Sequence, residues 1–325
     1  MLLFGLDASR PFAHKIALAL GIGLAPMEER DFEDGEHKAR PLVGVRGRDV
    51  FVVQSLHGGP DQSPNDKLCR LLFYLAALKE NGACRVTAVI PYLAYARKDR
   101  QTKSRDPVTT RYVAQLLEAM GVDCVVTLEV HNIVAFQNSF RCQTVHLDTR
   151  RLFADRARDL IGVSGAVIVS PDPGGVKRAQ LFREMLETVL GRPVDSAFMD
   201  KRRSAGIVTG EVLVGQVDGA TVLIIDDLIS TGGTVARAAR ACRDNGARNV
   251  YALAAHGLFV GEAGQALADP GLSKTFTTDT VPPFRLDQQT LRDHLEIVTA
   301  APLFGEAIRR IHEGGSITEL LEGSA

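Results

Sequence analysis

Cysteine is scarce in this sequence, and a long apolar run is missing from it. The chain of 325 residues has five cysteines, an odd number, and no CxxC pair. We therefore expect neither a disulfide framework nor a zinc site, and a reducing compartment, the cytoplasm, fits this cysteine usage best. No stretch approaches the roughly 18 apolar residues of a membrane span, and Asp7, Arg10 and Lys15 interrupt the N-terminal apolar stretches. Neither a membrane segment nor an export signal is expected.

The sequence also lacks an excess of charge of either sign. Its 38 Lys and Arg residues nearly balance 39 Asp and Glu residues, which gives a formal net charge of −1. A whole-domain surface for nucleic acid or membranes usually needs a clear positive excess, so we expect neither partner. Any basic site must be local. The GxxxxGK[ST] pattern of Walker-type kinases does not occur either, which excludes that mode of nucleotide binding.

The remaining composition is that of an ordinary folded protein with two domains. Apolar residues make up 45% and charged residues 24%, both close to the average for soluble proteins. At about 150 residues per domain, this length predicts two domains. A polar, arginine-rich stretch at residues 146–155 follows the last predicted strand of the first half. We place the boundary there, which predicts an N-terminal domain of residues 1–147 and a C-terminal domain of residues 148–325.

One pattern occurs in both halves of the chain. The short apolar runs DVFVVQ at residues 49–54 and TVLIID at residues 221–226 each end in a polar loop and are predicted to be buried strands. Each is followed by a predicted helix that ends at an Asn-Gly-Ala string, and then by another apolar strand. These are helices 67–80 and 235–244 and strands 85–90 and 249–254. The repeat predicts an α/β fold of two similar domains, each a mainly parallel sheet flanked by helices, with ligands at the carboxyl ends of the strands.

The strongest chemical signal is the string VLIIDDLISTGGT at residues 222–234. A buried strand runs into two carboxylates, Asp226 and Asp227, and then into a small, hydroxyl-rich loop before a helix. Glycines let the backbone close on an anion, and the helix amino end offers N–H groups and a partial positive charge. A capped helix would explain TGGT alone but not the whole string. The two acids are predicted to bind sugar hydroxyls, and the phosphate is assigned to Ser230, Thr231, Gly232, Gly233 and Thr234.

This string resembles the phosphoribosyl-binding motif of type I phosphoribosyltransferases and of ribose-phosphate pyrophosphokinases. A transferase usually has one such domain, whereas the repeated unit and five further strings resemble the pyrophosphokinases over nearly the whole chain. The resemblance implies a duplicated type I phosphoribosyltransferase-like fold that makes phosphoribosyl diphosphate from ATP and ribose 5-phosphate. The five strings are FEDGE at residues 32–36, YARKDR at 95–100, KSRDPV at 103–108, VSPDPGG at 169–175 and DKRR at 200–203.

The resemblance implies an ATP site in the first half of the chain. A basic segment of residues 97–105 follows a predicted strand, and it suits a triphosphate because Arg offers bidentate donors and Lys a point charge. A charged loop that faces water is the alternative for such a run, and DGE alone is only a turn. The residues assigned to ATP are Phe32, Asp34, Gly35, Glu36, Arg97, Lys98, Asp99 and His131.

The resemblance also implies Mg²⁺ as a cofactor, bound by His131 and Asp172 at two predicted strand ends. Because Mg²⁺ prefers oxygen ligands, His131 is as well suited to contact nucleotide phosphate or a metal-bound water. Lys201 and Arg203 are the expected catalytic residues. We expect the stretch behind them, residues 204–209, to be a mobile loop that lets these cations neutralise the charge developing on the diphosphoryl group. A solvated turn is the alternative.

The chain departs from the family pattern at several positions. Lys98 stands where many relatives have glutamine, Glu129 where they have aspartate, and Ser230 replaces a frequent aspartate. We therefore do not carry over the family's regulation by ADP and phosphate. The resemblance implies a homo-oligomer, either a dimer or a hexamer.

Two further functions stay open. A non-catalytic regulatory homologue would keep the fold without turnover, although the intact Lys201, Arg203 and Asp172 speak against it. A nucleobase phosphoribosyltransferase would leave the predicted ATP segments without a role.

Overall fold

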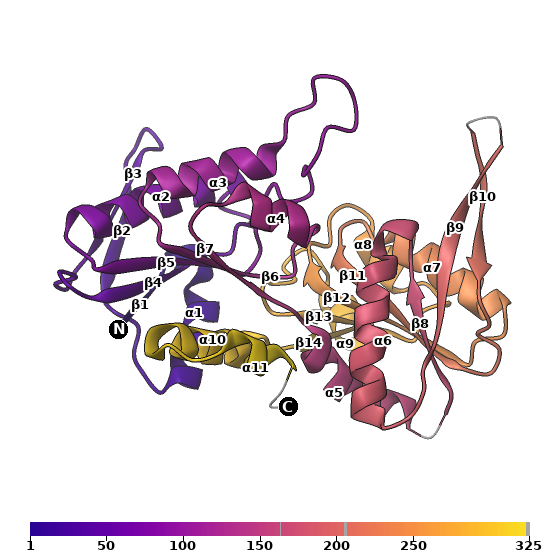
Figure 1. The fold of residues 1–325 in the computed structure, drawn as a ribbon. Helices are drawn as coiled ribbons and strands as arrows, with labels where there is room; N and C mark the ends of the chain where they lie inside the picture. Colours follow the sequence, from indigo (N-terminus) through magenta and orange to yellow (C-terminus); the bar gives the residue numbers. More distant parts are fainter. Residues whose placement is uncertain (163, 205–206, 323–325) are drawn as a thin grey trace. The chain divides into compact units, whose positions relative to one another are not determined.

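The computed structural model describes residues 1–162, 164–204 and 207–322, with all of their side chains except those of residues 201–211. The chain divides into two compact units (Figure 1). Unit 1 contains Met1–Asp148 together with Ala300–Ala325, and unit 2 contains Thr149–Thr299. The first boundary falls one residue from the expected position. The expected C-terminal domain of residues 148–325 needs a correction at its end, because the chain from Ala300 onwards belongs to unit 1.

Apolar packing between two helices explains why the C-terminal segment belongs to unit 1. The helix α10 (Ala301–Glu313) packs against α1 (Arg10–Leu20). The buried rings of Phe12 and Phe304 meet edge to face with centroids 5.6 Å apart. Gly305 permits this close approach, because a Cβ there would lie 3.0 Å from the Cβ of Ala19. Such long-range burial leaves no local signal in the sequence, which is why the predicted boundary missed it.

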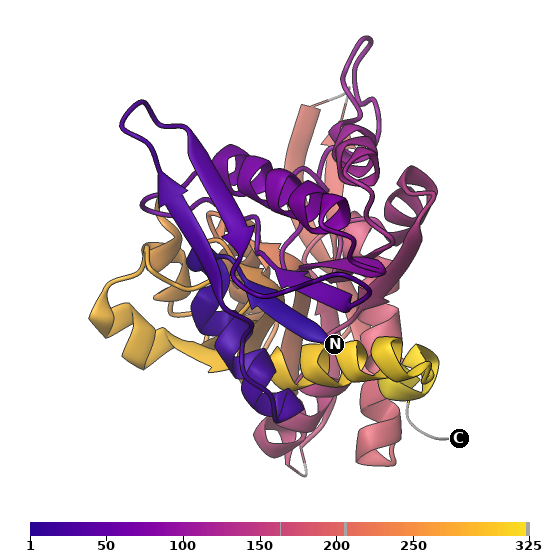
Figure 2. The ribbon, with the colours of Figure 1, turned by 90° about the vertical axis from the view of Figure 1, so that its left-hand side faces the viewer.

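Unit 1 contains a parallel sheet of five strands in the order β1-β4-β5-β6-β7. Helices α2 and α3 cover one face of this sheet, and α1 and α10 cover the other (Figures 1 and 2). A separate antiparallel hairpin, β2–β3, packs against α2. The elements are β1 (Leu2–Gly5), β2 (Met27–Asp31), β3 (His37–Pro41), β4 (Asp49–Val53), α2 (Pro64–Glu80), β5 (Arg85–Ile90), α3 (Thr109–Ala119), β6 (Cys124–Leu128), α4 (Ile133–Ser139), β7 (Gln143–Leu147) and α11 (Ile317–Glu322), with a short 3-10 helix η1 (Asp7–Ser9).

The predicted strands of unit 1 form, and its predicted helix begins three residues early. The reason is a capping box at the start of α2. The Ser63 hydroxyl accepts a hydrogen bond from the Asp66 N–H at 3.2 Å, and the Asp66 carboxylate accepts one from the Ser63 N–H at 2.7 Å. These two bonds satisfy amide donors that the helix itself leaves open.

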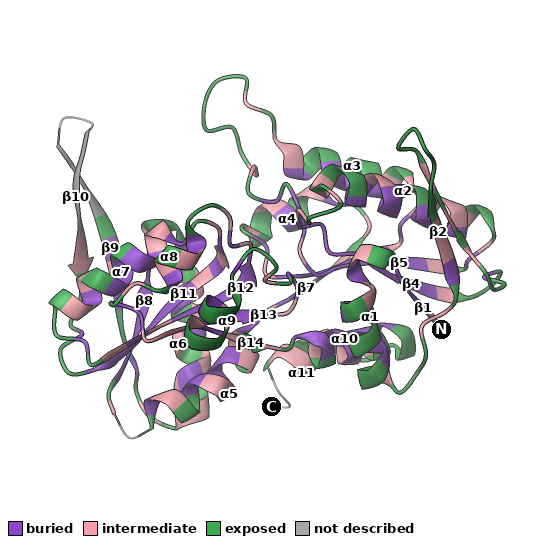
Figure 3. Ribbon diagram, turned by 180° about the vertical axis from the view of Figure 1, so that it is seen from behind, coloured by how far each residue is buried: buried purple, intermediate pink, exposed green. Residues whose placement is uncertain are grey.

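Unit 2 contains a sheet of seven strands in the order β10-β9-β8-β11-β12-β13-β14, parallel except for β10. The buried strands lie between helices whose outer faces are exposed (Figure 3). The elements are α5 (Arg150–Ile161), β8 (Ala166–Ser170), the 3-10 helix η2 (Pro173–Gly175), α6 (Val176–Leu190), β9 (Asp195–Ser204), β10 (Ile207–Val214), β11 (Thr221–Ile229), α7 (Gly233–Asp244), β12 (Asn249–Gly257), α8 (Ala263–Leu267), β13 (Lys274–Thr278), α9 (Gln288–His294) and β14 (Leu295–Val298).

Of the stretch at residues 204–209 that we expected to be a mobile loop, residues 205–206 lie outside the described residues, and the remaining ones belong to strands. Ser204 ends β9 and Ile207 begins β10, and these two strands pair antiparallel as a hairpin. The β-branched residues Ile207, Val208 and Thr209 favour an extended strand.

The same order of elements occurs in both units, which supports the predicted duplication. In unit 1 the chain runs β1, α1, the β2–β3 hairpin, β4, α2 and β5; in unit 2 it runs β8, α6, the β9–β10 hairpin, β11, α7 and β12. In unit 2 the chain leaves β8 for β9 on one side and later adds β11 on the other. The carboxyl ends of β8 and β11 therefore form the crevice in which an open α/β sheet binds its ligands.

Candidate active site

The loop after β11 is built around the start of helix α7. Gly232 precedes the helix with a φ of 77°, and a Cβ at this position would lie 2.6 Å from the Cβ of Ala266. Only glycine fits there without strain. Among the described residues no side chain caps the start of α7, so its first amide groups stay available for an anion. The hydroxyl residues assigned to the phosphate, Ser230, Thr231 and Thr234, lie on either side of this glycine turn.

The segment at residues 256–260, to which the sequence analysis gave no role in the site, holds this loop in place through backbone hydrogen bonds. The Ile229 carbonyl accepts hydrogen bonds from the amides of Leu258 and Phe259 at 2.9 and 3.2 Å, and the Ser230 carbonyl accepts one from Val260 at 2.9 Å. Phe259 is buried with a φ of 48°, and its ring lies only 2.2 Å from where a Cβ of Gly257 would be. The string HGLF at residues 256–259 therefore braces the loop, and Gly257 makes room for the aromatic ring.

Asp226 and Asp227 lie within β11, which ends at Ile229, three residues beyond the predicted strand 221–226. The Asp227 amide donates to the Asp226 carboxylate at 2.8 Å. Nη1 of Arg178 lies 3.7 Å from Asp226 Oδ1 and 3.5 Å from Asp227 Oδ1. Burial, together with the neighbouring carboxylate of Asp227, raises the pKa of Asp226, and Arg178 opposes that shift. The pair is thus a partly buried acidic site with the guanidinium of Arg178 beside it.

Arg178 is a site residue that sequence reasoning did not identify. It lies in the first turn of α6, three residues after the end of the VSPDPGG string. A lone arginine near the start of a helix carries no specific signal. Its contact with β11 arises only because β8 and β11 are neighbours in the sheet.

The turn after β8 holds Asp172 beside Arg178. The Asp172 carboxylate accepts a hydrogen bond from the Gly175 amide at 2.9 Å, and the Ser170 hydroxyl donates to the Asp172 carbonyl at 2.7 Å. A Cβ on Gly175 would lie 2.7 Å from the Ser170 hydroxyl and 3.9 Å from Nη1 of Arg178. Glycine thus lets the turn pack closely against the Ser170 hydroxyl.

Asp172 fits a magnesium ligand better than His131 does. One oxygen of the half-buried Asp172 carboxylate accepts the Gly175 amide. Mg²⁺ prefers oxygen ligands and usually completes its shell with water and substrate phosphates. The side chains that the structure describes contain no group of three or more His, Cys, Asp or Glu residues that could hold a metal ion. His131 is exposed and belongs to unit 1, whereas Asp172 belongs to unit 2.

The basic segment of unit 1 forms the connection between β5 and α3. Arg97 is exposed, whereas the ammonium of Lys98 bonds to the Asp106 carboxylate within the same loop. The Asp99 carboxylate accepts a hydrogen bond from the side-chain amide of Asn132 at 2.7 Å. The side chain of Asn132 also caps the start of α4. The structure therefore brings Asp99 close to the segment that follows β6, where His131 also lies.

The turn of the β2–β3 hairpin lies apart from this loop in unit 1. The turn is closed by a bond from the Phe32 amide to the Glu36 carbonyl at 2.8 Å and by one from the Glu36 amide to the Asp34 carboxylate at 3.1 Å. Gly35 has a φ of 90°, which the turn requires. Within the described part of unit 1, no hydrogen bond or ion pair joins this turn to the loop of Arg97. All residues assigned here to ATP in the turn are exposed.

The predicted catalytic side chains, those of Lys201 and Arg203, lie outside the described residues. Their backbones belong to β9, where Lys201 is in register with Glu211 of β10. None of the described helices has both the length and the apolar character that crossing a membrane requires.

Comparison with protein families gives three matches, two of them overlapping, that together span most of the chain. Residues 1–121 match the N-terminal domain of ribose phosphate pyrophosphokinase, residues 141–257 match the phosphoribosyl transferase domain, and residues 208–322 match the phosphoribosyl synthetase-associated domain.

Similar proteins align with the chain over nearly its full length. A ribose-phosphate pyrophosphokinase of Caldanaerobacter subterraneus subsp. tengcongensis is 38% identical over 97% of this chain and 95% of its own. Ribose-phosphate pyrophosphokinase 1 of Streptococcus pneumoniae is 37% identical over 98% of this chain and 96% of its own. The crystal structure of phosphoribosylpyrophosphate synthetase from Mycobacterium smegmatis superposes with a TM-score of 0.86 at 34% identity, covering 97% of this chain and 99% of that one.

Proposed function

The chain belongs to the ribose-phosphate pyrophosphokinase family, and we propose that it transfers the β,γ-diphosphoryl group of Mg-ATP to the C1 hydroxyl of ribose 5-phosphate. The products are phosphoribosyl diphosphate and AMP. The fold and the enzyme class expected from the sequence are confirmed by the relatives and by the solved structure. The observation that carries the proposal is the carboxylate pair of β11 beside the uncapped amino end of α7.

The acceptor side of the reaction follows from this arrangement. The carboxylates of Asp226 and Asp227 accept hydrogen bonds from the ribose hydroxyls, while the α7 amides and the hydroxyls of Ser230, Thr231 and Thr234 hold the 5-phosphate. Both contacts fix the sugar before reaction. Arg178 limits the mutual repulsion of the two carboxylates.

Positioning and charge neutralisation supply the catalysis. The C1 oxygen forms a bond to the β-phosphorus, the bond from that phosphorus to the α,β-bridging oxygen breaks, AMP leaves and the hydroxyl proton is released. Arg97 contributes to holding the triphosphate, and Lys201 and Arg203 neutralise charge on the transferred group. Magnesium, when bound, offsets phosphate charge, and Asp172 is the residue of unit 2 suited to hold it.

The cellular compartment and the oligomeric state of the enzyme are also part of the proposal. A reducing compartment, the cytoplasm, is proposed from the cysteine usage of the sequence. A homo-oligomer is proposed from the family resemblance.

A nucleobase phosphoribosyltransferase is not favoured, because residues 1–121 match the N-terminal domain of the pyrophosphokinases.

A product assay tests the proposal. The purified protein is incubated with Mg-ATP and ribose 5-phosphate, and AMP and phosphoribosyl diphosphate are counted together. We expect equal amounts of both. ADP as the sole product would show an ordinary kinase, and binding of both substrates without any product would show the non-catalytic regulatory homologue.

A further inference from the structure

We propose that Lys98 is a positioning residue that closes the β5–α3 loop through Asp106 and does not itself contact the nucleotide. The inference rests on the proposed function, in which this loop receives the triphosphate. It replaces the sequence-based assignment of Lys98 to ATP. The loop in question covers residues 97–106.

A single carboxylate oxygen of Asp106 accepts the hydrogen bonds that hold the loop together. Oδ2 of Asp106 accepts hydrogen bonds from the Thr102 amide at 3.1 Å, from the Lys103 amide at 3.0 Å and from the Thr102 hydroxyl at 2.7 Å. The same oxygen receives the ammonium of Lys98. That ammonium also lies 3.0 Å from the Thr102 hydroxyl, so the hydroxyl accepts from Lys98 and donates to Asp106. All four donors converge on a single atom.

The carboxylate of Asp106 keeps its charge at neutral pH. The side chains of Lys98 and Asp106 are only 31% and 25% exposed. Hydrogen bonds from Lys98, Thr102 and Lys103 hold the pKa of Asp106 far below its usual range. The carboxylate therefore stays ionised, and the ammonium of Lys98 is already neutralised by its own loop. A cation engaged in this way is poorly placed to serve as a phosphate ligand.

Both ends of the loop are fixed as well. The Thr110 hydroxyl contacts the carbonyl oxygens of Tyr95 at 2.9 Å and Lys98 at 3.2 Å, and the Gln101 side-chain amide donates to the Asp106 carbonyl at 2.9 Å. Arg105 has a φ of 70°, a conformation that a non-glycine residue keeps only where its surroundings impose it. The loop is therefore held in one shape without a ligand.

The closed loop leaves four other cations for the phosphates. Among the described residues these four exposed side chains form no ion pair, unlike Lys98. Because the backbone is already ordered, less conformational entropy is lost when they bind a triphosphate. The four residues are Arg97, Arg100, Lys103 and Arg105.

Three variants and a matched control test the proposal. Lys98→Met and Asp106→Asn each remove the ion pair, and Lys98→Gln keeps a donor without the charge. Arg100→Met removes an exposed cation of the same loop that takes no part in the cluster. Two quantities are measured for each: hydrogen exchange of a peptide spanning residues 97–106 in the nucleotide-free protein, and KM for ATP at saturating ribose 5-phosphate.

We expect Lys98→Met and Asp106→Asn to accelerate exchange of this peptide and to raise KM for ATP about fivefold each, with KM for ribose 5-phosphate unchanged. The double variant should be no worse than either single one, because both remove the same contact. Lys98→Gln should be intermediate. Arg100→Met should raise KM for ATP and leave exchange unchanged.

The proposal would be overturned if the Lys98→Met variant had a raised KM for ATP but unchanged hydrogen exchange of the loop peptide. Lys98 would then contact the nucleotide itself. Asp106→Asn with no effect on either quantity would overturn it too. A wild-type protein that forms no phosphoribosyl diphosphate would contradict the proposed function instead, and the exchange data would still report whether Lys98 closes the loop.

Discussion

Nδ1 of His256 lies 2.8 Å from the hydroxyl oxygen of Thr280. The hydroxyl of Thr278 donates its one hydrogen to the Ala255 carbonyl at 2.6 Å, so the 2.8 Å contact between Thr278 and Thr280 requires Thr280 to donate. Thr280 can then only accept from His256. Nδ1 of His256 is therefore a donor, and in the neutral imidazole this arrangement leaves Nε2 as an acceptor. His256 is in register with Leu228 of β11, between the carboxylate pair and the phosphate loop.

This hydrogen-bond chain makes a spectroscopic prediction. Nitrogen-15 NMR of the wild-type protein should show His256 protonated at Nδ1. Thr280→Val removes the acceptor and should shift the population towards protonation at Nε2, whereas Thr280→Ser keeps the hydroxyl and should preserve the wild-type tautomer. A wild-type spectrum with the proton on Nε2 would contradict the order of donors.

The site proposed for ribose 5-phosphate predicts variants that lose affinity for this substrate but keep their affinity for ATP. Asp226→Asn and Thr234→Val should mainly raise KM for ribose 5-phosphate, because each removes a group that holds the sugar phosphate before reaction. ATP binding should survive in both variants. Isothermal titration decides the matter: variants that lost ATP and kept ribose 5-phosphate would show that the two sites are assigned the wrong way round.

The contact of Arg178 with the carboxylate pair predicts a shift in pH dependence. Arg178 lowers the pKa of Asp226 against burial and the charge of Asp227, so Arg178→Met should raise that pKa further. The ionised pair would then form only at higher pH, and the rising limb of the kcat/KM profile for ribose 5-phosphate should move to higher pH.

Arg178→Lys keeps the positive charge and serves as the control. It should stay closer to the wild-type profile, because a single nitrogen of Arg178, Nη1, lies near both acids and an ammonium group can take its place. An unchanged profile in Arg178→Met would mean that this guanidinium does not govern the charge of the pair.

Removal of the Lys201 side chain should mainly lower the turnover number, kcat. A cation that meets the diphosphoryl group as its charge redistributes stabilises the transition state alone, and such a contact contributes about 3–4 kcal/mol. Lys201→Ala should therefore lower kcat about a hundredfold to a thousandfold with little change in KM. Steady-state kinetics test this. A near-normal kcat with a raised KM for ATP would move the catalytic role to Arg203 or elsewhere.

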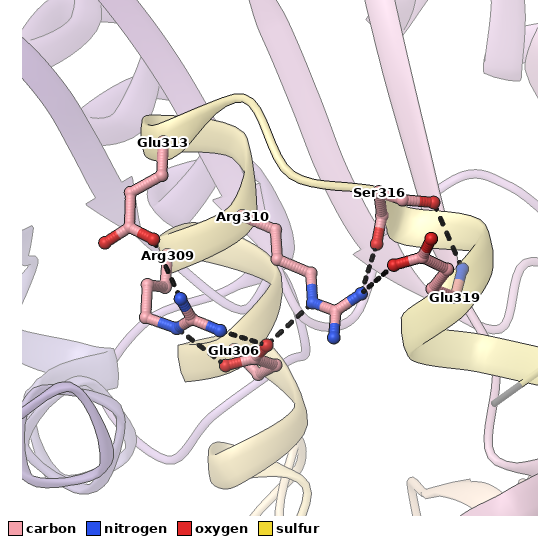
Figure 4. Close-up of polar contacts among 6 residues, drawn as sticks. All are labelled: Glu306, Arg309, Arg310, Glu313, Ser316 and Glu319. Carbon is pink, nitrogen blue, oxygen red and sulfur yellow. Dashed lines mark hydrogen bonds and ion pairs between the residues drawn. The ribbon is translucent and has the colours of Figure 1, made fainter. Parts of the chain in front are cut away.

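The packing of α10 on α1 predicts a large stability effect. Phe304 is fully buried against Phe12, so Phe304→Ala should lower the free energy of unfolding of unit 1 by about 3–5 kcal/mol. The matched control is Arg309→Ala on the same helix, which removes exposed ion pairs with Glu306 and Glu313 (Figure 4) and should have little effect. Thermal unfolding of both variants distinguishes core packing from surface charge.

The sequence by itself determined the features that are local along the chain. The alternation of apolar runs and helical stretches predicted strands β4, β5, β11 and β12 and helices α2 and α7, because burial on both faces of a parallel sheet demands continuous apolar runs. The string at residues 222–234 likewise carried its chemistry in order, since a strand, two acids, a glycine turn and a helix start follow one another directly.

Only the tertiary structure decided which distant residues meet. Arg178 reaches Asp226 because β8 and β11 are neighbours in the sheet, and Phe304 returns to Phe12 across almost the whole chain. Lys98 was assigned to ATP from the family resemblance of its basic segment, yet its ammonium bonds to the Asp106 carboxylate. A residue type fixes what a side chain can donate or accept. Which partner it finds depends on how the whole chain packs, because the free energy of burial is shared among elements far apart in sequence.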